Sequence, residues 1–156
     1  MSQQPSQPTS AIHAESEPHR SVTLTKIGDG RFKATNARGG ETFMGQGGDD
    51  PDFTPVELLL AAIAGCSGID VDLITRKRAQ AEQFEMTMSG EKIRDEQGNR
   101  LVDLRLTFDL RFPDDEHGDA ARAALPRALE MTRDRLCTVS RTVEAGTPVA
   151  FELGGE

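Results

Sequence analysis

Two cysteines, Cys66 and Cys137, are the residues of this chain best suited to chemistry. They are the only cysteines in 156 residues, and they lie 71 positions apart. A thiolate can act as a nucleophile, and two sulfurs can pair in a disulfide if the fold brings them together. In a reducing compartment such a pair is more often redox-active than structural. If the chain is an enzyme, we therefore expect its chemistry to run through sulfur.

Other residue types give no competing site. The three histidines, His13, His19 and His117, show no metal-ligand spacing and suggest no Ser-His-Asp arrangement. The glycine-rich stretch 45–51 lacks the Lys-Ser/Thr ending of a phosphate-binding loop, and its two aspartates would repel phosphate. We expect that stretch to be a flexible connector. The sequence predicts no bound metal and no cofactor.

Cys66 lies in a stretch, residues 54–78, that predicts a long buried helix. The stretch opens on Thr-Pro, which suits a helix start, and closes on three cations, which suit a helix end. Its first half is apolar on every face, so at least half of the helix should be buried. Apolar surroundings raise the pKa of a thiol, and Asp70 one turn later would add to that rise. Cys66 is therefore either a small core residue or a nucleophile that needs a cation from elsewhere.

Cys137 follows a second predicted helix, residues 120–135, which Pro126 should kink or split. It stands at a junction between two helical pieces. At the start of a helix, free N–H groups and the positive end of the dipole would lower the pKa of its thiol. The alternative is a packing residue at a helix kink.

The elements that must position the two thiols form an α+β pattern. Three short antiparallel strands are expected between residues 21 and 44, a fourth at 84–88 and a fifth at 102–112. The fifth has six alternating apolar residues, whose common face the buried helix should cover. A last strand is expected at 149–153. The order βββ-α-ββ-α-β predicts an α+β fold with antiparallel sheet, formed by one domain at 21–156 after a disordered tail at 1–20.

Composition limits the possible partners and the compartment. The net charge of −8 argues against nucleic acid and anionic membrane surfaces. No window reaches the roughly 18 apolar residues of a membrane span, and nothing resembles a secretory signal, so we expect a cytoplasmic protein. Hydrophobic residues make up 36% of the chain and aromatic residues only 4%. This low content suggests that the surface of a partner completes the core.

Two motifs carry a resemblance to a known family. A Pro-x-Glu-Leu-Leu-Leu-Ala-Ala-x-x-Gly-Cys helix at residues 55–66 and a Leu-Cys-x-Val-Ser-Arg-Thr motif at 136–142 resemble the OsmC/Ohr family over about residues 21–152. The run at 66–71 is most similar to its YhfA-like branch. The resemblance implies an OsmC-like fold, in which antiparallel sheets of two chains wrap around central helices in an intertwined homodimer.

The resemblance also implies an activity. Better-studied members of the family are thiol-dependent peroxidases that reduce organic hydroperoxides in oxidative stress defence. Carried over, Cys66 would attack the peroxide and become a sulfenic acid, and Cys137 would resolve it as a disulfide. A dithiol such as a lipoyl group would then reduce that disulfide.

The family activates its thiol with an arginine that a glutamate holds, and this sequence departs from that pattern. Val56 stands where the family has the glutamate, and Glu57 follows one position later. Nine residues of helix put Glu57 on the opposite face from Cys66, about 13.5 Å away along the axis, so it could act only across a dimer interface. For the arginine we expect Arg38, in a glycine-containing turn, with Arg31 as the second candidate.

Two other functions fit the same motifs. One is a non-enzymatic OsmC-like dimer whose interface cavity binds a small hydrophobic ligand, which Val56 favours. The other is a thiol redox sensor, in which the disulfide forms but alters a partner protein.

Overall fold

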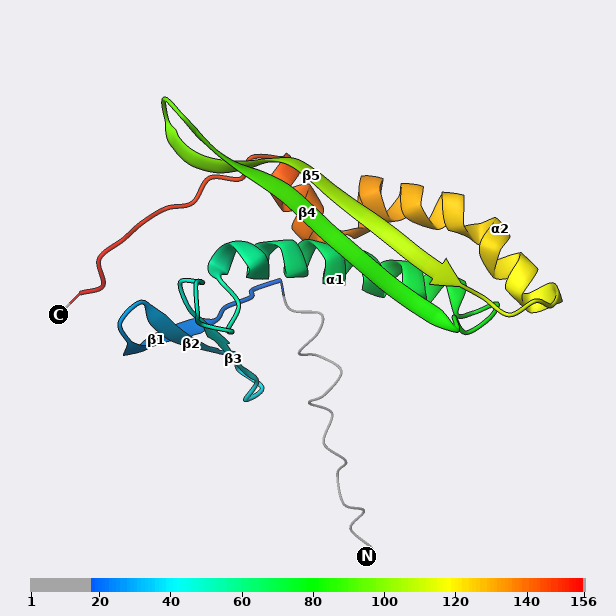
Figure 1. Cartoon of the computed structure of the whole chain (residues 1–156), viewed down its shortest axis with the longest axis horizontal. Helices are drawn as coiled ribbons and strands as arrows, with labels where there is room; N and C mark the ends of the chain where they lie inside the picture. The colour runs from blue at the N-terminus through cyan, green and yellow to red at the C-terminus, as the bar shows by residue number, and fades with distance from the viewer. Residues whose placement is uncertain (1–17, 156) are drawn as a thin grey trace, which may run out of the picture. The chain divides into compact units, whose positions relative to one another are not determined.

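The chain divides after Pro55 into two compact units. A computed structural model describes residues 18–155 (Figure 1). The expected tail at residues 1–20, with His13, lies almost wholly outside the described residues, so the domain start at residue 21 stays a prediction. The first unit contains strands only, and the second contains helices and a two-stranded sheet.

The first unit is a three-stranded antiparallel sheet in the order β1-β2-β3. Its strands are β1 (Thr23–Gly28), β2 (Arg31–Thr35) and β3 (Glu41–Met44). The turn after β2 is closed by Asn36, whose side-chain oxygen accepts hydrogen bonds from the backbone N–H groups of Arg38 and Gly40 at 3.0 and 2.9 Å. The predicted strands of this region are confirmed.

The loop after β3, which the sequence analysis expects to be a flexible connector, makes contacts with the sheet. The Gly45 N–H donates to the Phe53 carbonyl at 3.1 Å, and Met44 and Phe53 form a parallel bridge. The Arg31 guanidinium joins the carboxylates of both Asp50 and Asp52. Glycine content alone could not reveal an arginine that holds two aspartates about 20 positions later in the chain.

The second unit is built on α1 (Pro55–Thr75), which confirms the predicted helix and contains Cys66. Five of its 21 residues are buried, so the expectation that half of the helix is covered fails within one chain. Four of its large apolar side chains are exposed: Val56, Leu59, Ile69 and Leu73. The helix therefore offers more apolar surface than this chain covers.

By length and composition, α1 also meets the criterion for a membrane-crossing helix, with a mean hydropathy of 1.8. The prediction that no such window exists was therefore wrong. Core helices of water-soluble proteins meet the same criterion, and α1 packs on protein: a Cβ added at Gly68 would lie 2.4 Å from the Met86 side chain. The close contact places α1 against the strand that follows it.

That strand, β4 (Gln83–Asp95), forms an antiparallel hairpin with β5 (Gly98–Arg111). The alternation predicted for β5 holds from Leu106 onward, because Leu106, Phe108 and Leu110 are partly buried while their neighbours are exposed. Before that point it is interrupted at Asp103, where φ is +53° and the register with β4 shifts, and Leu104 is 38% exposed. Phe84 and Phe108 meet edge to face with ring centroids 6.4 Å apart. The apolar face of the hairpin therefore turns toward the helices.

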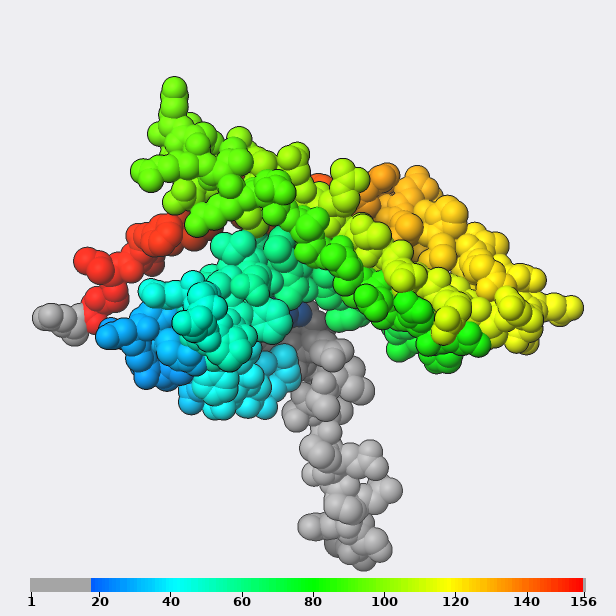
Figure 2. Space-filling view, viewed as in Figure 1, coloured from blue at the N-terminus to red at the C-terminus, as the bar shows by residue number. Residues whose placement is uncertain are grey.

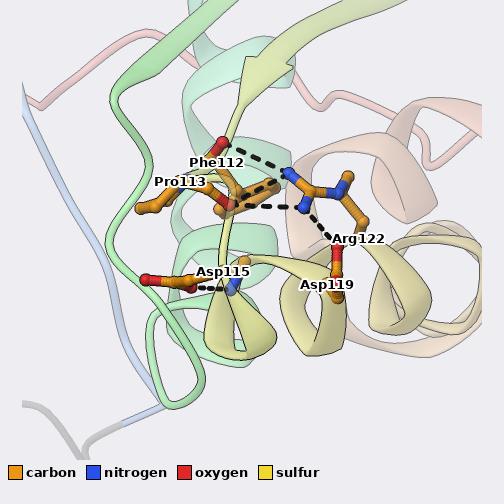
Figure 3. Close-up of polar contacts among 6 residues, drawn as sticks. Phe112, Pro113, Asp115, Asp119 and Arg122 are labelled. Carbon is orange, nitrogen blue, oxygen red and sulfur yellow. Dashed lines mark hydrogen bonds and ion pairs between the residues drawn. The ribbon is translucent and has the colours of Figure 1, made fainter.

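The end of β5 is fastened to α2 (Glu116–Met131) by a polar network (Figure 3). Arg122 donates to the carbonyls of Phe112 and Pro113 at 3.2–3.3 Å and pairs with Asp119 at 2.5 Å. The Asp115 side chain caps the helix by accepting from the Gly118 N–H at 2.8 Å. Beneath this junction the core consists of Ala79, Phe112 and Ala121.

The helix α2 continues through Pro126 to Met131, so the proline does not split it. The break comes later, where a π-helix, η1 (Thr132–Leu136), replaces the regular turn and α3 (Thr138–Glu144) follows. Cys137 lies between them, at the junction that the sequence predicts. π-Helical turns are rare in proteins, and those that occur are often found at functional sites.

The expected last strand at 149–153 is absent from residues 145–155 of the structure. Val149, Phe151 and Leu153 are 77%, 95% and 100% exposed, and the segment (red) leaves the rest of its unit as a single extended run (Figure 2). A strand forms only beside another strand that supplies hydrogen bonds, and no neighbour in residues 18–155 does so. Residues 149–153 therefore alternate as a strand does, but no strand in residues 18–155 pairs with them.

Candidate thiol site

The two cysteines meet where α1 passes the start of α3. Cys66 comes from the middle of α1, and Cys137 is the residue that caps the N-terminus of α3. Both are free thiols, and they lie close enough for each to shift the pKa of the other. The π-helical turn η1 aims Cys137 inward, with its backbone N–H bonded to the Thr132 carbonyl at 2.9 Å. The fold thus brings together the residues that the sequence analysis singled out.

Cys137 is completely buried and is surrounded by hydrogen-bonding groups. The Ser67 hydroxyl donates to its sulfur at 3.3 Å, and the Ser140 N–H does so at 3.5 Å. The thiol itself donates to the Ser140 hydroxyl oxygen at 3.2 Å. Burial raises the pKa of this thiol, but bonds from Ser140 and Ser67 outweigh burial, so the pKa lies below its ordinary value.

Cys66 is in the opposite electrostatic situation. Burial is the main reason why its pKa is raised, and the neighbouring Cys137 and Asp70 add to the effect. The Val139 backbone N–H lowers the pKa of Cys66, but not enough to cancel the rise. The expectation that the helix itself keeps Cys66 protonated agrees with this direction.

Asp70 contributes an unpaired group close to the site. One of its carboxylate oxygens is buried and has no hydrogen-bond partner among the described residues. Burial raises the pKa of this carboxyl above its ordinary value. The carboxyl lies one turn after Cys66 on α1, where i and i+4 side chains are neighbours.

A mainly apolar cavity of about 440 Å³ lies next to the hydrogen-bond partners of Cys137. Its volume falls within the range of small-molecule sites. Both serines that contact Cys137, Ser67 and Ser140, form part of its wall. The apolar lining comes from five elements and includes Ile63, Met88, Leu106, Phe108, Leu129 and Val143. A small apolar molecule in this cavity would lie one side chain away from the Cys137 sulfur.

The other predicted site residues lie elsewhere in the chain. Arg38 is exposed in the turn between β2 and β3 of the first unit. Arg31, the second candidate, already pairs with Asp50 and Asp52. Glu57 is exposed in the first turn of α1, nine positions before Cys66. Their predicted roles in activating the thiol therefore remain predictions.

Sequence reasoning missed Ser67 and Ser140. A serine in the middle of an apolar helix usually bonds to its own helix backbone, so Ser67 gave only a weak signal. Ser140 was visible only as part of the second motif.

The cavity wall also contains a cation, Arg133, whose guanidinium is held by Asp134 at 2.8 Å. Within residues 18–155, no group of three or more His, Cys, Asp or Glu could hold a metal ion.

An α+β fold with two neighbouring free thiols near a mainly apolar cavity defines a two-cysteine thiol protein. A sequence model of one family, described as OsmC-like protein, matches residues 47–152. The match covers more than half of the chain, and the chain belongs to this family. The predicted family and its α+β class with antiparallel sheets are confirmed.

Individual relatives support the assignment. An uncharacterised protein of Mycobacterium tuberculosis is 30% identical over 131 residues, which cover 83% of this chain and 93% of that protein. Protein YhfA of Escherichia coli is 28% identical over 114 residues, which cover 72% of this chain and 81% of YhfA. The crystal structure of an OsmC-like protein from Mycoplasma pneumoniae shares the fold, with a TM-score of 0.65 at 15% identity, over 82% of this chain and 89% of that one.

Proposed function

We propose that the chain is a thiol-dependent peroxidase that reduces organic hydroperoxides through the Cys66/Cys137 pair in oxidative stress defence. The observation that supports this most strongly is the proximity of the two free thiols, each of which shifts the pKa of the other, beside serines that line a cavity of about 440 Å³. A cavity lined mainly by apolar side chains favours alkyl hydroperoxides over hydrogen peroxide. Hydrogen peroxide would lose its hydrogen bonds to water on entering, and apolar side chains offer none in return.

The reaction balances with the groups at hand and an external dithiol. One thiolate attacks the outer peroxide oxygen, which breaks the O–O bond, releases an alcohol and leaves a sulfenic acid. The second thiol then displaces water and forms the disulfide. A dithiol of the lipoyl type returns both cysteines to thiols by exchange, and a reducing cytoplasm suits this cycle.

We also propose that the working form is a homodimer. The four exposed apolar side chains of α1 and the three of the C-terminal segment support it, because a single chain leaves them in water. Arg38 and Glu57 are then proposed to act on the thiols across the interface, where the arginine would lower the pKa of the attacking thiol.

Turnover tests the proposal directly. Reduced protein with dihydrolipoamide should consume cumene hydroperoxide over many cycles, and the variants Cys66→Ser and Cys137→Ser should each lose steady-state turnover by at least about 100-fold. Ser89→Ala, on an exposed position of β4, is the control and should be unaffected. Loss of peroxide at the same slow rate with and without the protein would refute the enzymatic function.

One observation favours a second candidate, a non-enzymatic binder of a small hydrophobic ligand. The cavity is large enough for such a ligand, and Val56 replaces the glutamate that peroxidases of the family use. This alternative predicts that Cys66→Ser keeps full affinity for an apolar probe. It also predicts that peroxide leaves both thiols free.

A further inference from the structure

Among residues 18–155, the cavity wall has three residues with a hydroxyl group, and all three are hydrogen-bonded to Cys137. The Ser67 hydroxyl donates to the sulfur at 3.3 Å, and the Ser140 hydroxyl accepts from it at 3.2 Å. The Thr132 carbonyl accepts from the Cys137 backbone N–H at 2.9 Å. The other uncharged residues of the wall are apolar. Because the three residues share one neighbour, the cavity has a hydroxyl-rich end next to Cys137.

Thr132 differs from the two serines because its hydroxyl is unused. Its Oγ1 is buried and has no hydrogen-bond partner in residues 18–155, and the whole residue is 3% exposed. A helical threonine ordinarily donates to a carbonyl one turn earlier, and Thr75 and Thr142 do so at 3.0 and 2.7 Å. At Thr132 the regular helix α2 gives way to the π-helical η1. An unpaired buried hydroxyl opposes folding, so a molecule that supplies its partner gains a hydrogen bond there.

We propose that the cavity binds a small amphiphile, a molecule with one oxygen-bearing head and an apolar body, and that the Thr132 hydroxyl binds the head. The inference deepens the proposed peroxidase function, on which it rests for the chemistry. In that reaction the head is the hydroperoxy group, and Thr132 is a positioning residue that holds this group at the hydroxyl-rich end, near the thiol pair. Binding of the head makes and breaks no covalent bond.

One rotation of the side chain is enough for this role. Thr132 carries a hydroxyl and a methyl group on the same carbon, and rotation about its Cα–Cβ bond exchanges their places. Helical threonines populate two such rotamers, and the exchange needs no backbone movement. A hydroxyl both donates and accepts, so it matches the oxygen of an alcohol, which does the same, and the two oxygens of a hydroperoxide.

Two probes that differ only in the head test the assignment, 2-phenylethanol and ethylbenzene. Their affinities for the reduced wild-type protein and for Thr132→Val are measured by isothermal titration calorimetry. Thr132→Val keeps the shape and removes the hydroxyl, so it should weaken 2-phenylethanol by about fivefold to tenfold, the contribution of one hydrogen bond. It should leave ethylbenzene unchanged. Thr132→Ser, which keeps the hydroxyl, should retain the wild-type ratio of the two affinities even if the valine variant does not fold.

The matched control is Thr142→Val, at an exposed helical threonine outside the cavity wall, which should leave both affinities unchanged. Thermal unfolding of the free protein separates binding from structure. The Thr132 hydroxyl makes no bond without a ligand, so Thr132→Val should not lower the melting temperature. An unchanged ratio of affinities in Thr132→Val, or a wild-type protein that binds neither probe, overturns the inference.

Turnover gives a second readout. With cumene hydroperoxide and dihydrolipoamide, Thr132→Val should raise KM by about fivefold to tenfold and leave kcat within about twofold. A lower kcat at unchanged KM would contradict head binding by Thr132. Because 2-phenylethanol does not react with thiols, its binding is independent of the peroxidase function. A wild-type protein that binds the alcohol through Thr132 but consumes no peroxide refutes that function alone.

Discussion

Ser67 and Cys66 are neighbours on α1, yet they meet different parts of the site. Successive helical residues point about 100° apart, so the serine is buried against Cys137 while the cysteine stays half-buried. The two cysteines could be identified from the sequence because they are the only ones and each lies in a motif. The contact between Ser67 and Cys137 could not be predicted, because the two residues are 70 positions apart. Their contact also depends on the π-helical turn η1, which no local sequence pattern predicts.

Asp70 provides a prediction at the residue scale. Its carboxyl is held above its ordinary pKa by burial, so it favours folding only while it is protonated. That contribution is complete below the unfolded pKa of about 3.9 and is lost as pH rises through the higher folded value. Asp70→Asn should therefore raise the melting temperature at pH 7, and the gain should disappear toward pH 4.

The control for Asp70 is Asp72, two positions later on the same helix. Asp72 pairs with Arg76 at 3.3 Å, so Asp72→Asn removes a favourable contact and should not raise the melting temperature. Thermal unfolding of both variants across this pH range gives the answer. An equal gain at pH 4 and pH 7 would show that the Asp70 charge is not the cause.

At the scale of elements, the patterns that depend on one chain segment were predictable. The alternation of β5 gave its buried face, and the apolar run gave α1. The segment at 149–153 has the same alternation as β5, but a strand also needs an edge to pair with. The junction at Cys137 was predicted, whereas a split at Pro126 was not found, because α2 continues through that proline to Met131.

The junction of β5 and α2 gives a prediction at this scale. A Cβ on Gly118 would lie 1.7 Å from the Pro113 carbonyl oxygen, a backbone atom that cannot rotate away. Gly118→Ala should therefore lower the free energy of unfolding by about 3 kcal/mol, at the upper end of overpacking costs. Urea unfolding measures the change.

Ala120, exposed in the same turn, supplies the control for this junction. Ala120→Ser should change the free energy of unfolding by less than about 0.5 kcal/mol. If Gly118→Ala were equally neutral, the close approach of the first turn of α2 to Pro113 would be wrong.

At the scale of the whole molecule, the order of elements was enough to predict an α+β class, and two motifs were enough to predict the family. The oligomeric state could not be derived in the same way, because exposed apolar side chains indicate that a surface is covered without identifying what covers it. Ile69 is 64% exposed on α1, where three other large apolar side chains are also exposed, which fits a helix covered by a second copy. A dimer of twice 16.9 kDa is the form we expect in solution.

Ile69→Lys tests this assembly. A lysine placed in an apolar interface should raise the dimer dissociation constant by at least about 100-fold, or ~2.7 kcal/mol, as measured by analytical ultracentrifugation. Thr87→Lys, on the exposed face of β4, adds the same charge and should leave the constant unchanged. A wild-type protein that sediments as a monomer at micromolar concentration would contradict the proposed dimer.

The most direct test of the thiol pair is the oxidation state after one equivalent of cumene hydroperoxide. Intact-mass and peptide mass spectrometry should show the loss of two hydrogens per chain and one disulfide-linked peptide pair that contains Cys66 and Cys137. Added dihydrolipoamide should restore both thiols. If both cysteines remain free, or if the disulfide joins two chains through the same cysteine, the redox pair inferred from their proximity does not exist.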